Sequence, residues 1–218
     1  MLKDDPITKT VIIILMCIGG GVLFFYNPFS HSLKEILIYI FVNPLILFST
    51  MACLMIIGFR VYTEYDRTIL RIRFDETDNF LMYNEKKEIS ILVLTVSGFL
   101  GMTCLLSIRN FVDFLYLFIV IIVYIVNIHS FIYIMKFIFR YNNNKLAAFS
   151  IVYITMFIFN FILKIPFGKQ FGFDILFIYS INFENFLLRS IFQLLICLII
   201  NEVFRIVYHK TCERQDVL

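Results

Sequence analysis

Tryptophan is absent from this sequence and charged residues are scarce, at 16% of the 218 residues. A soluble domain carries about 25% charged residues and roughly 45–50% apolar ones. Here 61% of the residues are hydrophobic, and no soluble core of this length can bury so much Ile and Phe. The shortage of charge therefore excludes an ordinary soluble domain. It predicts an all-α integral membrane protein that crosses the bilayer several times.

Disulfide and metal patterns are missing as well. Of the five cysteines, Cys17, Cys53, Cys104 and Cys197 fall inside apolar runs and Cys212 lies in the basic tail. Because no CxxC or Cys/His spacing occurs, neither a disulfide framework nor a zinc site is predicted. The net charge of +3 is small and follows the loops, which indicates membrane topology and gives no reason to expect a nucleic-acid partner.

The groups that an intramembrane enzyme needs do not converge in this sequence. Such catalysis requires HExxH, a Ser/His or Ser/Lys pair, or two Asp residues at membrane depth. The Asp residues are terminal, in loops or, for Asp113, at the very start of a span, and His129 has no acidic residue close to it in its own apolar run. We therefore expect no enzymatic activity and no metal site in this chain.

The absence of Trp, together with many Ile, Phe, Asn and Lys residues, is typical of a low-GC bacterial genome. This composition points to a multi-pass protein of the bacterial plasma membrane. The first apolar run follows Lys3 and Lys9, as in a signal peptide, but Asn27-Pro28 replaces a small-residue cleavage site. We expect it to be retained as the first helix.

Six apolar runs approach the roughly 20 residues that a spanning helix needs. They form a single transmembrane domain over 1–218, with spans at approximately 9–27, 35–58, 89–108, 112–139, 146–165 and 186–208. Glycines 19–21 in the first run permit close approach by a neighbouring helix. Asn43-Pro44 predicts a kink in the second. The fourth run is the longest, so it must tilt or project beyond the bilayer.

The distribution of Lys and Arg predicts the orientation, because cytoplasmic loops are enriched in both residues. With both termini inside, the inner side holds Lys3, Lys9, Arg60, Arg67, Arg71, Arg73, Lys86, Lys87, Lys136, Arg140, Lys145, Arg205, Lys210 and Arg214. The outer side holds Lys34, Arg109, Lys164, Lys169 and Arg189. The split of 14 against 5 among the 19 basic residues predicts an N-in, C-in protein with six spans.

The last outer connection, residues 166–185, is aromatic and apolar but too short to cross the membrane and return as two full helices. Gly168 and Gly172 interrupt it. Because irregular backbone is not tolerated against lipid at depth, we expect a re-entrant or interfacial extracellular hairpin between helices 5 and 6.

The large inner loop, residues 60–88, contains the pattern of a short helix at 75–87. It has an acidic start, aromatic residues Phe80 and Tyr83 three apart, and a basic end at Lys86 and Lys87. Two interpretations are open for this helix. It either docks on a soluble partner or lies on lipid headgroups, drawn there by its basic residues.

Polar residues inside the spans are costly and often mark function. Those in spans four to six are Asn127, His129, Asn160, Gln193, Asn201 and Glu202. The simplest interpretation is that each hydrogen-bonds a neighbouring helix. Asn127 and His129 lie about 200° apart around a helix, which speaks against a shared metal site.

The basic residues of the spans also have simple expected roles. Glu202 and Arg205 are spaced to pair with each other, and Lys136 and Arg109 are long enough to snorkel to the interface.

Over the stretch 69–97 the chain resembles permease subunits of type-2 (ABC-2-like) ATP-binding-cassette exporters. The shared pattern is a basic–aromatic start at Arg71, Arg73 and Phe74, a short helix with an aromatic residue at Phe80, and a basic exit at Lys86 and Lys87. The layout of six spans, an inner helix between spans two and three and an apolar hairpin between spans five and six matches that family over nearly the whole chain.

The resemblance implies a function. The segment 75–87 is then the coupling helix, and its partner-binding residues are Arg73, Phe74, Phe80, Tyr83, Lys86 and Lys87. The candidates for the substrate path are Asn43, Asn127 and Asn160. Partners are cytoplasmic ABC ATPase subunits, a second permease copy or homologue, and membrane lipid.

Because nothing in the chain resembles an ATP-binding domain, the resemblance implies that ATP and Mg²⁺ are bound only by the partner ATPase. The cargo is expected to be amphipathic or apolar: a peptide, a lipid-linked molecule or a drug. The alternative is a stand-alone membrane protein of binding, immunity or sensor type with no transport activity.

Overall fold

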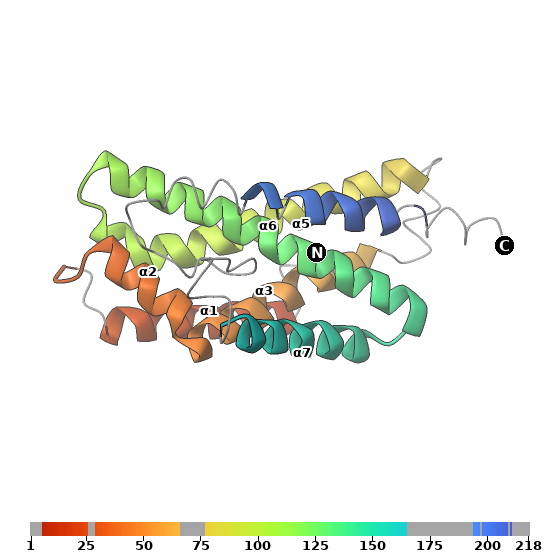
Figure 1. Cartoon of the computed structure of the whole chain (residues 1–218), viewed down its shortest axis with the longest axis horizontal. Coiled ribbons are helices and arrows are strands. Elements are labelled where there is room, and N and C mark those ends of the chain that lie inside the picture. The colour runs from red at the N-terminus through yellow and green to blue at the C-terminus, as the bar shows by residue number, and fades with distance from the viewer. Residues whose placement is uncertain are drawn as a thin grey trace.

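In a computed structural model, the chain forms a bundle of α-helices (Figure 1). The structure describes residues 6–25, 29–65, 77–164, 194–196, 198–208 and 210, and this part of the chain contains no β-strand. The elements in order are α1 (Pro6–Phe25), α2 (Leu33–Val42), α3 (Pro44–Tyr65), α5 (Thr77–Cys104), the short 3₁₀ helix η2 (Leu105–Ser107), α6 (Phe111–Asn142) and α7 (Lys145–Lys164). A further helical stretch, here called the C-terminal segment, covers residues 194–196 and 198–208.

Three stretches of the described chain are long and apolar enough to cross a membrane: Ile7–Phe25, Glu85–Ser107 and Phe111–Asn142. The pair Leu33–Phe41 and Leu45–Arg60 passes the same criteria as one broken span. These four agree with the first four predicted spans. The apolar part of α7 with described side chains, Lys145–Ile158, is shorter than a full span. The fifth and sixth spans and the orientation remain predictions, and the hairpin over 166–185 lies outside the described residues.

The kink predicted at Asn43-Pro44 is confirmed, because α2 and α3 meet there at 75°. Pro44 has no N–H to donate, and its ring disfavours a helical conformation in the residue before it. Asn43 accordingly has φ −72° and ψ 111°. Its backbone N–H donates to the Tyr39 carbonyl, while its side-chain Oδ1 accepts from the Leu45 N–H. The asparagine therefore ends one helix and caps the next.

Asparagines also define the ends of α6. Asn110 is the N-cap and accepts a hydrogen bond from the Asp113 N–H at 2.8 Å. At the other end Asn143 adopts the left-handed conformation, with φ 49°, which asparagine tolerates better than most residues. Asn144 then accepts from the N–H groups of Leu146 and Ala147 at the start of α7. The turn joining α6 to α7 is therefore tight, with Asn143 and Asn144 between the two helices.

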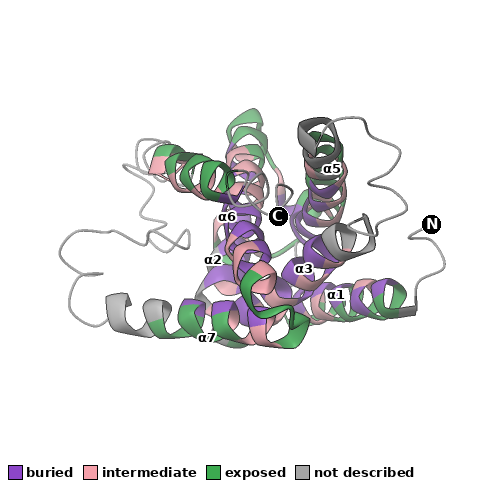
Figure 2. Ribbon diagram, turned by 90° about the vertical axis from the view of Figure 1, so that its right-hand side faces the viewer, coloured by how far each residue is buried: buried purple, intermediate pink, exposed green. Residues whose placement is uncertain are grey.

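The core of the bundle lies around α6, which packs against α3, α5 and α7 (Figure 2). Between residues 127 and 133 every α6 side chain is buried, so both sides of this helix face protein. A polar contact crosses the core where the Thr50 hydroxyl of α3 and the Tyr124 hydroxyl of α6 lie 3.0 Å apart. We conclude that α6 is the central helix and that its polar residues face other helices.

Glycines allow close helix contacts at two points. A side chain at Gly19 of α1 would collide with Met102 of α5, whereas one at Gly20 would meet nothing within 4 Å. A side chain at Gly58 of α3 would collide with Ile132 of α6. The close approach predicted for the glycines of the first helix is therefore found at Gly19.

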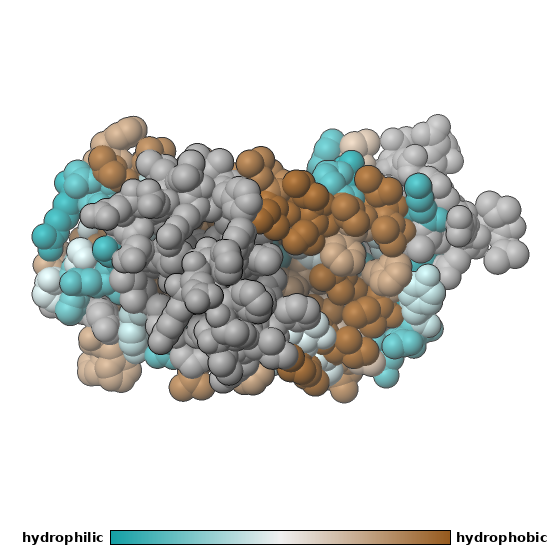
Figure 3. Space-filling model, in the orientation of Figure 1, coloured by the Kyte–Doolittle hydropathy of each residue, from teal (hydrophilic) through white to brown (hydrophobic). Residues whose placement is uncertain are grey.

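The helix ends fall into two groups. The end of α3, the start of α5, the α6–α7 turn and the last turn of the C-terminal segment lie toward one end of the bundle, and the start of α2 and the α5–α6 turn lie toward the other (Figure 1). Among the described residues on the face shown in Figure 3, hydrophobic ones dominate to the right of the centre.

Candidate functional site: the start of α5 and a buried ionic cluster

Helix α5 is longer than a membrane requires. Its 28 residues span about 42 Å at 1.5 Å per residue, while the hydrocarbon core of a bilayer is about 30 Å thick. The apolar window begins only at Glu85, so residues 77–84 form two turns of helix ahead of it. The short inner helix predicted for this region is therefore the first part of α5, continuous with the span that follows.

The side chains at this start of α5 are exposed. Met82 is 47% and Tyr83 39% accessible, and Lys86 is exposed as well. The Lys87 ammonium lies over the Tyr83 ring, 5.4 Å from its centroid. A cation at this distance from an aromatic face is attracted to it, which holds the two side chains on one side of the helix. The result is a small aromatic–basic surface.

The structure describes the side chains of three of the six predicted partner-binding residues. These three, Tyr83, Lys86 and Lys87, lie together on the first turns of α5. Phe80 is on the same helix, but its side chain lies outside the described residues. Arg73 and Phe74 also lie outside them.

One residue beyond Lys87, the helix enters the interior of the bundle. Glu88 is fully buried, and two cationic or titratable residues of α6 face its carboxylate: Lys136, 2% accessible, and His129, 5% accessible. The Lys136 ammonium contacts Glu88 Oε2. His129 Nε2 lies 3.4 Å from Glu88 Oε1, as an ionic contact without the alignment of a full hydrogen bond. We call these three residues the ionic cluster.

The C-terminal segment contacts the same cluster. His129 Nδ1 is 3.1 Å from Asn201 Oδ1, and the buried Tyr208 lies beside Tyr133 with ring centroids 6.1 Å apart. The Lys136 ammonium sits 4.6 Å from the Tyr133 centroid. The cluster thus joins α5, α6 and the C-terminal segment through polar contacts.

Charges inside a membrane protein must be paired, because an isolated buried charge costs several kcal/mol. Glu88 and Lys136 neutralise each other, and the aromatic rings of Tyr133 and Tyr208 add favourable faces for the ammonium. His129 is the third group, and it is charged only when both of its ring nitrogens are protonated. The ionic cluster can therefore hold or release a proton.

Sequence reasoning missed this cluster. Glu88 was placed at the end of a solvated loop, and the expectation that Lys136 snorkels to the interface is wrong, because Lys136 is buried against Glu88. A signal was present in the spacing: His129, Tyr133 and Lys136 recur at i, i+4 and i+7, which places all three on one face of a helix. An acidic residue on a neighbouring helix is the partner that such a face requires.

Two other expectations about polar residues are confirmed. His129 does contact a polar group of a neighbouring helix, Asn201. Glu202 and Arg205 do pair, with 3.1 Å between Oε2 and Nε, and both are exposed.

The candidates for a substrate path do not form one group. Asn43 caps the break between α2 and α3, and its side-chain oxygen accepts from the Leu45 N–H. Asn127 is buried on α6, 3% accessible. The side chain of Asn160 lies outside the described residues. The structure therefore does not bring these three asparagines together.

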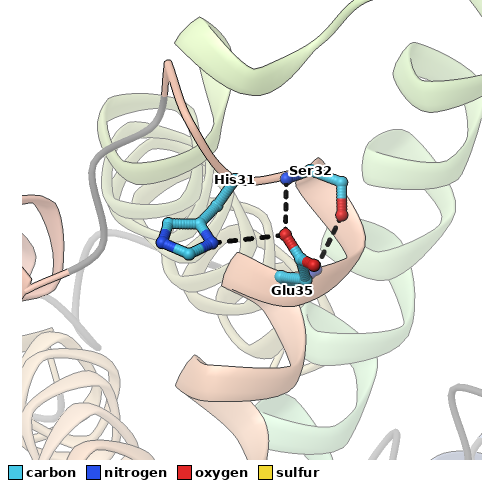
Figure 4. A network of polar contacts seen from close by, with 3 residues as sticks. All are labelled: His31, Ser32 and Glu35. Carbon is cyan, nitrogen blue, oxygen red and sulfur yellow. Dashed lines mark hydrogen bonds and ion pairs between the residues drawn. The ribbon is translucent and has the colours of Figure 1, made fainter.

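At the other end of the bundle, His31, Ser32 and Glu35 form an exposed network (Figure 4). The Ser32 N–H donates to Glu35 Oε2 at 2.8 Å and the Glu35 N–H donates to Ser32 Oγ, which is a capping box at the start of α2. His31 Nδ1 lies 3.3 Å from the same carboxylate oxygen. The Ser-x-x-Glu spacing was the available signal, and the roles of these residues in capping account for the network.

Within the described ranges, no group of three His, Cys, Asp or Glu residues is arranged to hold a metal ion. Comparison with known proteins adds no assignment: no protein-family model, no curated protein and no solved structure matches this chain.

Proposed function

We propose that this chain is the permease subunit of an ABC exporter that moves an amphipathic or apolar cargo out of a bacterial cell. ATP is hydrolysed by separate cytoplasmic subunits, and a second permease copy or homologue completes the complex. The start of α5 is the element that meets the ATPase. The observation that carries this proposal is the form of α5, a docking surface and a membrane span on one uninterrupted helix.

The continuity of α5 suits a coupling role. An exposed aromatic beside two lysines is a compact anchor for a pocket on a soluble protein, since aromatic residues contribute strongly at interface centres. Tyr83 lies in the same helix as the buried Glu88, five residues away. A displacement of the anchor therefore passes directly into the interior of the bundle, without a flexible joint between them.

The placement of charge also supports the proposal. The α5 start shares its end of the bundle with Arg140 and Lys145 of the α6–α7 turn, and the opposite end carries Lys34 and Arg109. Since cytoplasmic loops are enriched in Lys and Arg, a cytoplasmic α5 start follows from the predicted orientation. An ATPase partner would be found on that side.

The test is co-purification with a candidate ATPase encoded beside this protein. The variants are Tyr83→Ala, Phe80→Ala and the double variant Lys86→Gln/Lys87→Gln, each compared with wild type. If the aromatic anchor contributes about 2 kcal/mol, Tyr83→Ala weakens ATPase capture roughly 30-fold at an unchanged membrane level. Phe29→Ala is the matched control, because Phe29 is an exposed aromatic toward the opposite end of the bundle.

The other interpretation of the helix gives a different pattern. If the α5 start lies on lipid headgroups, Tyr83→Ala has a small effect, and the Lys86/Lys87 variant releases the segment in a salt-dependent way. If wild type recovers no ATPase at all, the exporter assignment fails. A stand-alone membrane protein of binding, immunity or sensor type then becomes the better interpretation.

A further inference from the structure

The ionic cluster contains a proton that its geometry does not assign to a single atom. With the Asn201 amide oriented so that Oδ1 faces the ring, His129 Nδ1, 3.1 Å away, carries the donating proton, because Oδ1 can only accept. In a neutral imidazole the other nitrogen, Nε2, is then a bare acceptor. Nε2 faces Glu88 Oε1, which as a carboxylate oxygen is also only an acceptor.

Two acceptors facing each other inside a membrane bundle repel each other, and a second proton on Nε2 removes this repulsion. His129 is then an imidazolium beside the Glu88 carboxylate. With the Asn201 amide in this orientation, the geometry suits a proton-loaded form in which both ring nitrogens carry a proton.

A form with one proton fewer needs only one local change. Turning the Asn201 amide by 180° presents its nitrogen, which donates to an unprotonated Nδ1. His129 then carries its single proton on Nε2 and donates it to the Glu88 carboxylate. In this second form each ring nitrogen of His129 faces a group of the opposite hydrogen-bonding role. The proton that is lost goes to solvent.

We propose that Glu88, His129 and Asn201 form a proton-binding site inside the membrane bundle, with two stable forms that differ by one proton and by the orientation of the Asn201 amide. The site lies between α5, α6 and the C-terminal segment. Its protonation therefore changes the contact that links α6 to that segment. The proposal stands whether or not the start of α5 docks on an ATPase.

The surroundings can accommodate the extra positive charge. The titratable or charged groups nearest His129 on the three contributing elements are Glu85, Glu88, Tyr133, Lys136, Arg205 and Tyr208. Two carboxylates, Glu85 and Glu88, balance Lys136 and a protonated His129. Helix α3 ends toward the same end of the bundle, and Arg60 is the charged residue among its described side chains. Among the described side chains of α7, the titratable ones are Lys145, which is exposed, and Tyr153, which stacks on Phe149.

The test is histidine NMR on the full-length protein in lipid nanodiscs, because the chain has only three histidines. With ¹⁵N-labelled histidine, the two ring nitrogens report the tautomer and charge of each residue directly, and His129→Gln identifies the His129 signals. We expect His129 to convert from the proton-loaded form to the form with one proton fewer as the pH rises. At low pH both ring nitrogens are protonated, and at high pH the neutral form carries its proton on Nε2.

Two variants separate the site from an ordinary titrating histidine. Glu88→Gln is expected to change the pH at which His129 converts. Asn201→Leu leaves every charge in place but removes the acceptor for Nδ1–H, so it is expected to hold His129 in the neutral Nε2–H form throughout. Glu202→Gln, next to Asn201 but exposed and paired with Arg205, is the matched control and should change nothing.

The proposal is overturned if His129 keeps one tautomer and charge across the whole pH range. It is also overturned if His129 converts identically in wild type and Asn201→Leu. The first of these two outcomes is measured on the wild-type protein, so the test remains decisive even if Glu88→Gln does not fold.

Discussion

Lys136 is buried, and its four-carbon chain ends between a carboxylate and an aromatic ring. Removing one partner of a buried ion pair leaves an uncompensated charge and typically costs about 3–5 kcal/mol, whereas replacing both partners by neutral groups costs far less. The contribution of Lys136 to stability thus depends on Glu88 being ionised opposite it.

Lys136→Met is therefore expected to lower the free energy of unfolding by about 3–5 kcal/mol. The double variant Glu88→Gln/Lys136→Met should recover most of that loss, because no unpaired charge remains. Denaturant unfolding in detergent micelles measures both. Arg205→Met removes one partner of an exposed pair and is the control, with an expected cost of about 1 kcal/mol or less. Additive losses in the double variant would show that the two residues act independently.

Residues whose roles depend on their own helix were predictable. Asn43-Pro44 breaks a helix through proline's missing N–H, and Glu202 and Arg205 pair at i, i+3 within one helix. The partners of His129 come from 41 residues earlier, at Glu88, and 72 residues later, at Asn201. The spacing of residues within one helix does not show which residues of another helix lie opposite them. The ionic cluster therefore could not be predicted from the sequence pattern of α6.

At the scale of elements, the packing of α1 on α5 is governed by a single missing side chain. Gly19 lies directly against Met102, with Thr103 and Phe99 beside it, and Gly20 faces open space. Small residues at helix interfaces in membranes allow backbones to approach closely, which is where much of the association energy arises. The two adjacent glycines therefore differ in role despite sharing one sequence motif.

Gly19→Leu is expected to destabilise the protein by about 1–3 kcal/mol, because the added side chain must displace α1 or Met102. Gly20→Leu, one residue away, should be tolerated and could even favour the helix, since glycine is a poor helix former. Thermal unfolding of the two variants in the same detergent gives the comparison. Equal losses would indicate that helix propensity, rather than contact with α5, determines the effect.

The helix break at Asn43-Pro44 was predicted correctly, whereas the boundary before the third span, inferred from charged residues, was not. The apolar window Glu85–Ser107 agrees with the predicted span at 89–108. The polar residues before it were assigned to a separate helix because their composition changes abruptly. Backbone hydrogen bonding continues across that change, since Asn, Glu and Lys are compatible with helix.

At the scale of the whole molecule, each end of the bundle has its own set of turns. Asn143, in the α6–α7 turn, and Ser30, just before α2, are both exposed and lie toward opposite ends. The charge distribution predicts that the Asn143 end faces the cytoplasm. This orientation can be tested independently of any partner.

On a cysteine-free background, Ser30→Cys should react with a membrane-impermeant thiol reagent in intact cells, and Asn143→Cys should react only after the membrane is permeabilised. The background is needed because Cys17 is exposed on α1. Labelling of Asn143→Cys in intact cells would show that the orientation is the reverse of the predicted one. The start of α5 would then not face the cytoplasm. Equal labelling of both positions in intact cells would contradict a bundle that spans the bilayer.

The uninterrupted course of α5 has a mechanical consequence. The helix is held at Glu88 by contacts to Lys136 and His129, with about 16 Å of helix before that point and about 24 Å after it. Because α1, α3 and α6 also pack against α5, a displacement of its start passes into several helix contacts together. The ionic cluster is the charged one among these contacts, so its protonation changes how firmly α5 is held within the bundle.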